Sequence, residues 1–192
     1  MNLKKYFQES KIIAAVKDEA AFKRALTSKC PVIFLLSGEI LTVKKIVEEA
    51  HAHDKIIFLH FDMIDGFGKD EAAVRYIKEK IRPDGIISIK SSVIKWAETH
   101  GLDYIYRVFM IDSQSFESAL NNIRRFKIEN IEIMPGIIPD VIEVLMKECP
   151  ANYISGGLIT TEEQVLEILN SGAIACSTSN EILWKNYQKF NK

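Results

Sequence analysis

The chain has 192 residues, of which 47% are hydrophobic and 27% charged, and its 25 basic and 26 acidic side chains leave a formal net charge of −1. This apolar content and near-neutral charge exclude an intrinsically disordered chain, and no apolar run approaches the roughly 18–20 residues of a transmembrane helix. A pI near 6.4 argues against a protein that holds nucleic acid through bulk charge alone.

The N-terminal segment and the cysteines indicate the compartment. The start of the chain lacks the apolar stretch and the small-residue cleavage pattern of a signal peptide. Cys30, Cys149 and Cys176 are odd in number and have no CxxC spacing, so they indicate neither a disulfide framework nor a zinc site. We therefore expect a reduced, cytoplasmic protein with no resident metal or cofactor.

Eight short apolar runs, rich in β-branched and aromatic residues, recur about every 23 residues along the chain. Runs of this kind predict strands that are covered on both faces. The predicted strands are Ile12–Val16, Val32–Leu36, Ile56–Phe61, Gly85–Ile89, Tyr104–Met110, Ile131–Met134, Tyr153–Ser155 and Ala173–Cys176.

The intervals between the strands have helical spacing, because their apolar residues return every three or four positions. The spacing is clearest over Ala20–Leu26, Ile40–Ala50, Ala73–Ile81 and Val141–Leu145. Capping residues predict helix starts at Asp18, at Asp112 or Ser113, at Thr160 or Thr161, and at Asn180. The fourth interval, Val93–His100, has room only for a short helix.

Regular alternation of strand and helix predicts parallel strands, since a helical crossover returns the chain in the same direction. Two architectures satisfy this pattern, an open doubly wound sheet and a closed barrel. Eight units without a skipped helix, and no GxGxxG after the first strand, favour the barrel. The sequence therefore predicts one compact (β/α)₈ TIM-type barrel that spans residues 1–192 as a single domain.

In such a barrel the ligand site lies at the C-terminal ends of the strands, and phosphate groups often bind after strands seven and eight. Glycines after strand seven allow close approach of the backbone, and hydroxyls and N–H groups at a helix start favour an anion. The predicted phosphate residues are Gly156, Gly157, Ser177, Thr178, Ser179 and Asn180. The alternative is that the glycines form only a turn and the later residues only a helix cap.

Polar residues at the other strand ends predict a polar mouth around this site. His60, Asp62 and Asp65 follow the third strand, and so many titratable groups are too costly to bury without partners. Asp65 alternatively caps the next helix. Lys90 ends the fourth strand and either pairs with a carboxylate or phosphate or, less in keeping with its setting, acts as a Schiff-base amine.

Arg107 and Glu132 lie on the fifth and sixth predicted strands. The two side chains form either a buried ion pair or contacts with a ligand at the mouth. No nucleophile–base pair stands out among the residues at the strand ends, so no catalytic residue is predicted.

The motifs at the strand ends together resemble the glycerol uptake operon antiterminator regulatory proteins. These motifs are, in chain order, HFDMIDG, IISIKSS, RVFMIDS, EIMPG, SGGLI, and STSN followed by LW, and the similarity runs from about Ile12 to Trp184. The resemblance implies a small (β/α)₈ barrel that is not an enzyme. It also implies a regulator that responds to glycerol 3-phosphate, or a similar phosphorylated polyol, and binds leader mRNA of glycerol-utilisation genes to prevent termination.

The RNA-binding residues implied by this resemblance are not evident from composition. The best candidates are Arg124, Arg125 and Lys127 on the fifth helix, because basic side chains neutralise RNA phosphates. Two further clusters are Lys78, Lys80 and Arg82, and Lys185, Lys189 and Lys192. A nearly neutral barrel needs a concentrated basic patch or a homodimer to hold RNA.

One alternative function is a small phosphate-binding barrel enzyme, an isomerase, lyase or glyceryl-phosphate transferase, that uses Asp62 or Glu132 as a general base. Its substrate would be a phosphorylated triose or polyol. Another is a metabolite-binding protein that acts on a protein partner.

Overall fold

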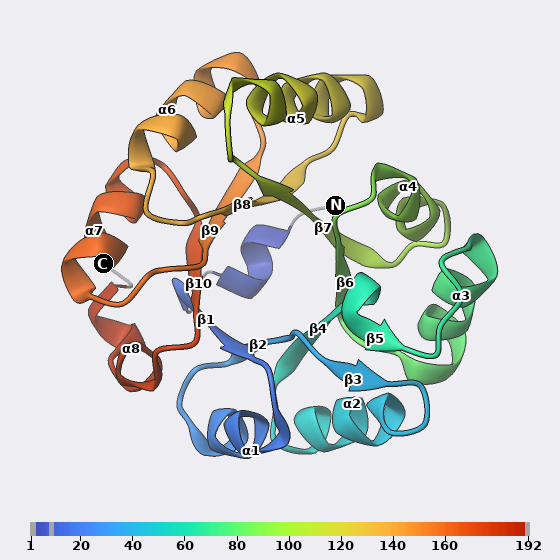
Figure 1. Cartoon of the computed structure of the whole chain (residues 1–192). Coiled ribbons are helices and arrows are strands. Elements are labelled where there is room, and N and C mark those ends of the chain that lie inside the picture. The colour runs from blue at the N-terminus through green and yellow to red at the C-terminus, as the bar shows by residue number, and fades with distance from the viewer. Residues whose placement is uncertain (1–2, 8–9, 191–192) are drawn as a thin grey trace.

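The structure, a computed structural model, describes residues 3–7 and 10–190. In this part of the chain, eight parallel strands close into a barrel in the order β1-β10-β9-β8-β7-β6-β4-β2, and helices surround it (Figure 1). The predicted (β/α)₈ barrel is confirmed. The first and last strands pair with each other, Ile12 with Cys176 and Ala14 with Thr178, and this pairing closes the ring.

The barrel strands occur close to where the apolar runs predict them. They are β1 (Ile12–Val16), β2 (Val32–Leu35), β4 (Ile56–His60), β6 (Gly85–Ser88), β7 (Asp103–Phe109), β8 (Asn130–Met134), β9 (Asn152–Gly156) and β10 (Ala175–Thr178). A separate two-stranded sheet, β3 (Gly38–Glu39) and β5 (Ile64–Asp65), joins the loops that follow β2 and β4.

The helices each follow a barrel strand and return the chain to the start of the next one. They are α1 (Glu19–Thr27), α2 (Val43–Ala52), α3 (Glu71–Tyr76), α4 (Ser91–Thr99), α5 (Ser113–Phe126), α6 (Pro139–Glu148), α7 (Glu162–Asn170) and α8 (Glu181–Lys185). A π-helical segment, Ile77–Ile81, extends α3, and short 3₁₀ turns span Leu3–Phe7, Phe61–Met63 and Tyr187–Phe190. Among the described residues, none of the helices has the length and hydropathy needed to cross a membrane.

Local capping chemistry decides where the helices begin. Asp18, Asp112, Thr161 and Asn180 each accept a hydrogen bond from a backbone N–H in the first turn, as predicted. The cap of α3 is Asp70, which accepts from the Ala73 N–H. The alternative prediction that Asp65 caps this helix is therefore wrong, since Asp65 lies in β5.

Two predicted boundaries differ from the structure in ways that affect the site. The last strand begins at Ala175 rather than Ala173, because the turn at Gly172 (φ 102°) precedes it and pairing with β9 starts at Ala175. Ser177 and Thr178 therefore belong to the strand and not to the loop after it. The fourth helix is nine residues long, Ser91–Thr99, and so is not the shortened element expected from the sequence.

The barrel interior is built in layers, because every second residue of a strand points inward. A buried apolar layer contains Phe34, Phe58, Ile105 and Ala175. Two residues further along β4, β7 and β10 are His60, Arg107 and Ser177, which form with Glu132 of β8 a buried polar layer toward the strand C-terminal ends. The core thus changes from apolar to polar toward the mouth.

The opposite end of the barrel is closed by the 3₁₀ turn Leu3–Phe7, which crosses the barrel axis in Figure 1. Leu3 and Phe7 are buried in the same apolar cluster as Phe58. The Tyr6 hydroxyl donates a hydrogen bond to Asp103 Oδ2 at 2.7 Å. Burial beside this carboxylate raises the pKa of Tyr6 well above its usual value. The mouth is therefore the open end of the barrel.

Candidate functional site

A pocket of about 470 Å³ lies at the mouth, between the ends of β1, β7, β9 and β10. The residues that line it are Ala15, Lys17, Leu36, Arg107, Met134, Gly157, Leu158, Ile159, Thr160, Ser177, Thr178, Ser179 and Asn180. Five of the six predicted phosphate residues are brought together here; Gly156 is not in the lining. That these residues bind phosphate stays a prediction.

A buried ion pair forms the floor of the pocket. Arg107 Nε donates to Glu132 Oε2 at 2.7 Å, and the two side chains are only 5% and 0% exposed. Ser177 Oγ donates to the other carboxylate oxygen of Glu132 at 2.6 Å. The sequence left two alternatives for Arg107 and Glu132, a buried ion pair or contacts with a ligand, and the structure contains the ion pair. Within the described residues, no hydrogen bond uses the two terminal nitrogens of Arg107.

Gly156, the last residue of β9, and Gly157, which follows it, are glycines for different structural reasons. Gly156 is buried at the end of the strand, and a Cβ there would collide with Glu132 Oε1 and Ser177 Oγ. Its small size thus makes room for the ion pair. Gly157 lines the pocket with φ +81°, a conformation that side chains disfavour, so here the backbone itself requires glycine.

The residues after Gly157 and at the end of β10 are held by hydrogen bonds within the protein. Thr178 Oγ1 donates to the Ile159 carbonyl at 2.7 Å and accepts from the Asn180 N–H. The Asn180 side chain caps α8 and donates to the Thr160 carbonyl. Because the Ser177 and Thr178 hydroxyl protons are already donated, Ser179 carries the exposed hydroxyl of this segment.

His60 faces the polar layer from the opposite wall of the barrel. Burial, and the positive charge of Arg107, lower its pKa to about 4, so the imidazole is neutral at pH 7. Its Nδ1 atom is buried, and no described residue bonds to it. His60 therefore supplies an uncharged polar group next to the ion pair.

Hydrogen bonds hold the Asp62 side chain against the end of β6. It lies in the 3₁₀ turn after β4, and its Oδ2 accepts from Ser88 Oγ at 2.8 Å and from the Ile89 N–H at 3.0 Å. Its Oδ1 atom is buried without a partner among the described residues. The turn redirects the side chain, which the strand period alone does not predict.

Asp65 and Lys90 are not brought to the pocket. Asp65 is exposed on β5, where its backbone carbonyl accepts from the Ile40 N–H. Lys90 is exposed at the N-terminal cap position of α4 and makes no ion pair within the described residues. Neither residue is in the pocket lining, and their role as ligand contacts stays a prediction.

The predicted RNA-binding residues lie at the opposite end of the barrel. Arg124 and Arg125 are in the last turn of α5, and Lys127 is its C-terminal cap residue. All three are exposed. Lys192, from another candidate cluster, lies outside the described residues.

Lys17 is the charged residue of the pocket lining that the sequence did not predict. It directly follows β1 and is exposed on the pocket lining. Its position at a strand C-terminal end was the available signal, because the first strand obeys the same rule as the others. Together Lys17 and Arg107 place two positive charges on this pocket.

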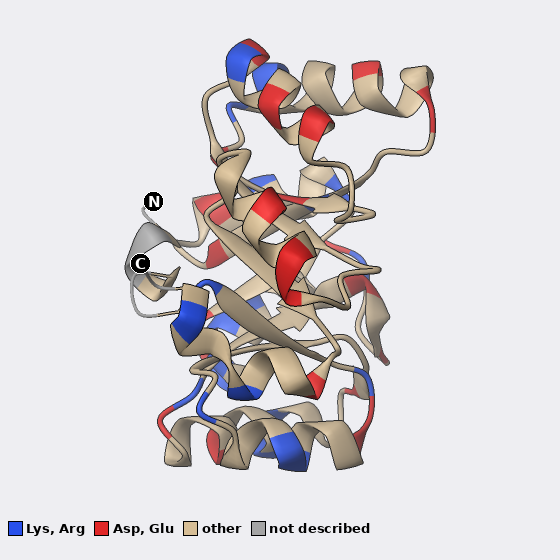
Figure 2. Cartoon of the chain, turned by 90° about the vertical axis from the view of Figure 1, so that its left-hand side faces the viewer, with Lys and Arg blue, Asp and Glu red and all other residues tan. Residues whose placement is uncertain are grey.

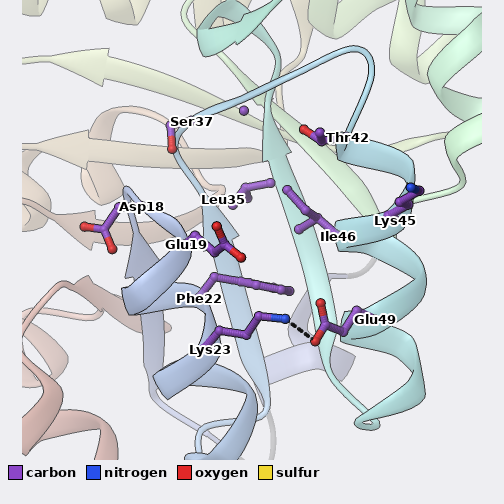
Figure 3. A pocket seen from close by; sticks show the side chains of 11 residues that line it. Asp18, Glu19, Phe22, Lys23, Leu35, Ser37, Thr42, Lys45, Ile46 and Glu49 are labelled. Atoms are coloured by element: carbon purple, nitrogen blue, oxygen red, sulfur yellow. Dashed lines mark hydrogen bonds and ion pairs between the residues drawn. The ribbon is translucent and has the colours of Figure 1, made fainter.

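A second hollow, of about 360 Å³, lies on the outside of the barrel between α1 and α2 (Figure 3). Phe22, Leu35 and Ile46 contribute its apolar surface, and Lys23 forms an ion pair with Glu49 across it. Its lining contains none of the residues predicted to bind a ligand or RNA. The mouth pocket is thus the candidate site.

The three cysteines are free, and Cys176 and Cys30 are buried. Burial raises the pKa of both thiols, to about 12 for Cys176 and about 11 for Cys30. A protonated, buried thiol is a structural group and not a nucleophile. These residues therefore belong to the core.

Comparison with known proteins identifies the family of the chain. Residues 12–184 match the family model described as "Glycerol-3-phosphate responsive antiterminator". A relative from Escherichia coli K12, the uncharacterized protein YgcP, is 34% identical over 184 residues, which cover 96% of each chain.

Two solved structures have the same fold at a similar level of identity. One is a glycerol uptake operon antiterminator regulatory protein from Listeria monocytogenes, with 34% identity, a TM-score of 0.88, and 91% of this chain and 95% of that chain covered. The other is a glycerol uptake operon antiterminator-related protein from Thermotoga maritima, with 33% identity, a TM-score of 0.82, and coverage of 92% and 98%. The chain thus belongs to the family of glycerol-3-phosphate responsive antiterminators.

Proposed function

We propose that the protein binds glycerol 3-phosphate in the mouth pocket and, in this loaded state, binds leader mRNA of glycerol-utilisation genes so that transcription continues past a terminator. Family membership supports the effector and the regulatory role. Such a role acts on nascent transcripts in the cytoplasm and needs no cofactor or catalytic residue.

The observation that carries this proposal is the state of Arg107. A guanidinium that is 95% or more buried lines the pocket, and Glu132 holds it through Nε alone. Its two terminal nitrogens are therefore available for a phosphate, which arginine binds through paired hydrogen bonds. Lys17 and the backbone at Gly157 would complete the phosphate subsite, with Ser179 and Asn180 at its edge.

The glycerol part would extend from the phosphate toward His60. The buried His60 Nδ1 and Asp62 Oδ1 atoms lack partners within the described residues, and such atoms in a native protein call for a ligand or water. Alcohol hydroxyls both donate and accept, so they suit this pair of groups. Asp65 and Lys90 have no assigned contact in the proposal.

The decisive experiment measures effector binding, RNA binding and turnover on one preparation. Calorimetry with glycerol 3-phosphate is compared with binding of a labelled leader transcript of the glycerol-uptake operon, with and without the effector, and with turnover assays on phosphorylated trioses. We expect effector-dependent RNA affinity and no turnover. Turnover without RNA affinity would instead support the enzyme function.

A variant at Gly157 tests the position of the phosphate. Gly157→Asp places a carboxylate at the pocket, and unit charges 4 Å apart repel by about 4 kcal/mol at an effective dielectric of 20. We therefore expect glycerol 3-phosphate affinity to fall at least about 100-fold. Gly157→Asn introduces the same strain without the charge and is expected to bind within about 10-fold of the wild type.

A second control separates backbone strain from site chemistry. Gly101 has a positive φ of +65° and open space around it, in the loop between α4 and β7 at the other end of the barrel. Gly101→Asp is expected to leave effector affinity unchanged. Equal affinities of the Gly157→Asp and Gly157→Asn variants would contradict the phosphate position.

A further inference from the structure

The helices of this barrel carry opposite charges at their two ends. Because every helix runs from the mouth to the closed end, side chains that complement the helix dipole collect on opposite faces of the molecule. Acidic residues occupy first turns at the mouth, namely Glu19, Glu71, Asp140, Glu162 and Glu181. In Figure 2 red segments predominate along the right-hand edge, away from the two termini.

Basic residues occupy the last turns, at the closed end. They include Arg24 of α1, Lys80 in the segment after α3, Arg125 of α5, Lys147 of α6 and Lys185 of α8. The separation of charge is not complete, because three of the first-turn acids pair with side chains from the C-terminal ends of helices or from the turn after α8. These pairs are Glu181 with Arg24, Glu71 with His100 and Glu162 with Lys189. The face nonetheless retains exposed cations that have no ion pair within the described residues, among them Lys80, Lys147 and Lys185.

Four basic residues at the ends of two neighbouring helices form the α5–α6 basic patch, namely Arg124, Arg125, Lys127 and Lys147. Arg124 joins the two helix ends, since it donates to the Glu148 carbonyl and pairs with its carboxylate at 2.6 Å. The other three cations form no ion pair within the described residues. A polyanion can therefore meet three free positive charges here.

Arg125 has a second feature that suits a nucleic acid. Its guanidinium carbon lies 5.1 Å from the centroid of the Phe126 ring, so the aromatic face supports the charged group. RNA-binding proteins use guanidinium planes and aromatic rings to stack unpaired bases. The patch thus combines charge for the RNA backbone with a surface for bases.

The mouth face offers the opposite surface. Besides the acidic helix starts, its loops expose large apolar side chains, including Leu41, Met63, Ile111 and Leu158. Acidic and aliphatic groups do not neutralise phosphates, and phosphate neutralisation supplies most of the affinity for nucleic acids. Charge complementarity therefore favours RNA at the closed end and not beside the effector pocket.

We propose that RNA docks on the closed end of the barrel, centred on the α5–α6 basic patch, so that effector and RNA occupy opposite ends of the molecule. This inference rests on the proposed function and adds the docking face. The shortest covalent path between the two sites is β8, because Lys127 precedes it and Glu132, which holds Arg107, lies within it. These two residues are roughly 16 Å apart along the chain at 3.3 Å per residue. The effector therefore acts on RNA through the barrel and not by touching it.

The test removes two charges from each face in turn. Arg125→Gln/Lys127→Gln alters the patch, and Lys45→Gln/Lys69→Gln removes two exposed lysines at the mouth end, so both variants have the same net charge. The probe is the labelled leader transcript of the glycerol-uptake operon of the organism that encodes the chain, with a scrambled RNA of equal length beside it.

We expect the patch variant to weaken leader RNA binding at least about 10-fold and to reduce the slope of log K against log salt by about 1.4–1.8, as for two lost phosphate contacts. The mouth variant is expected to stay within about 2-fold. Calorimetry with glycerol 3-phosphate alone should give wild-type affinity for both variants, which shows that the folded pocket is intact.

Two outcomes would overturn the proposal while leaving the proposed function in place. In one, wild-type protein binds the leader RNA but the patch variant binds it equally well. In the other, the mouth variant loses more affinity than the patch variant. Absence of any RNA binding by the wild type, despite glycerol 3-phosphate binding, would instead refute the proposed function and the docking face together.

Discussion

Arg107 and Glu132 show how a single buried pair prepares the pocket. Burying two charges is expensive, and an apolar pair of similar volume is often at least as stable, so the ion pair is weak evidence for a purely structural role. What the pair achieves is orientation, because Glu132 is fixed by Ser177 and in turn fixes Arg107 Nε. A cation already held in place loses little freedom when an anion binds.

The buried imidazole of His60 predicts a specific pH dependence of stability. Its pKa is about 4 in the folded protein, against about 6.5 when unfolded, so between these values the unfolded state binds more protons. The free energy of unfolding should therefore fall as the pH drops from about 6.5 to 4, by on the order of 3 kcal/mol in total. Above pH 6.5 the group is neutral in both states and contributes no slope.

This prediction is checked by urea unfolding of the wild type and of His60→Gln between pH 4.5 and 7.5. Glutamine cannot be protonated, so the difference in unfolding free energy between the two proteins should narrow toward low pH. A difference that stays constant over this range would show that His60 does not titrate as inferred.

At the residue scale, the sequence predicts which polar residues follow the strands but not which partners these residues contact. Gly156 and Ser177 are predicted phosphate residues, and the structure adds that Gly156 leaves room for Glu132 and that Ser177 donates a hydrogen bond to it. This contact joins residues 45 positions apart, and no local pattern encodes it. Turn geometry was equally hidden, as the reorientation of Asp62 shows.

At the scale of elements, helix starts were predicted well because a cap is a local contact. Asp112 and Thr161 each bond to a backbone N–H three residues later, so the relevant partners are adjacent in the sequence. The choice between Asp65 and Asp70 was different. Both precede α3, and only the pairing of β5 with β3, a tertiary contact, removes Asp65 from the helix start.

This distinction gives a stability prediction with a matched pair of variants. Asp70→Ala removes the cap of α3 and should lower the free energy of unfolding by about 1 kcal/mol. Asp65→Ala removes an exposed side chain and should change it by less than about 0.5 kcal/mol. Chemical unfolding of both variants checks this, and a larger loss for Asp65→Ala would reverse the assignment.

The β3–β5 sheet restricts movement of the loop after β4. The segment Met63–Lys69, with Gly66 and Gly68, has the composition of a hinged lid, but Ile64 is buried and pairs with Gly38. A Cβ at Gly66 would also contact Ile40. Any movement of this segment must therefore include the loop after β2.

At the scale of the whole molecule, the number of strand–helix units can be predicted, because each of the eight units repeats the same pattern of an apolar run followed by an amphipathic helix. The turn Leu3–Phe7 could not be predicted in this way, because five residues are too few to show a periodic pattern of apolar side chains. The turn closes the end of the barrel, and this role depends on the barrel having formed. The α5–α6 patch was visible as charges, but its place opposite the pocket depends on the closed topology.

Placement of effector and RNA on opposite ends predicts a reciprocal effect. If glycerol 3-phosphate increases RNA affinity by some factor, bound RNA must increase glycerol 3-phosphate affinity by the same factor. Typical coupling would amount to about 5- to 150-fold. Calorimetric titration of the effector into free protein and into the preformed RNA complex measures this factor, and identical affinities in the two titrations would exclude coupling.

The pairing of β1 with β10 has a consequence during protein synthesis. The mouth pocket takes Lys17 from the residue after β1 and Ser177 to Asn180 from β10 and the segment after it, so it lies across the seam where the ring closes. A nascent chain still lacking β10 has no complete pocket, however well its earlier units have formed. Synthesis must therefore proceed through Asn180 before the two walls of this pocket can meet.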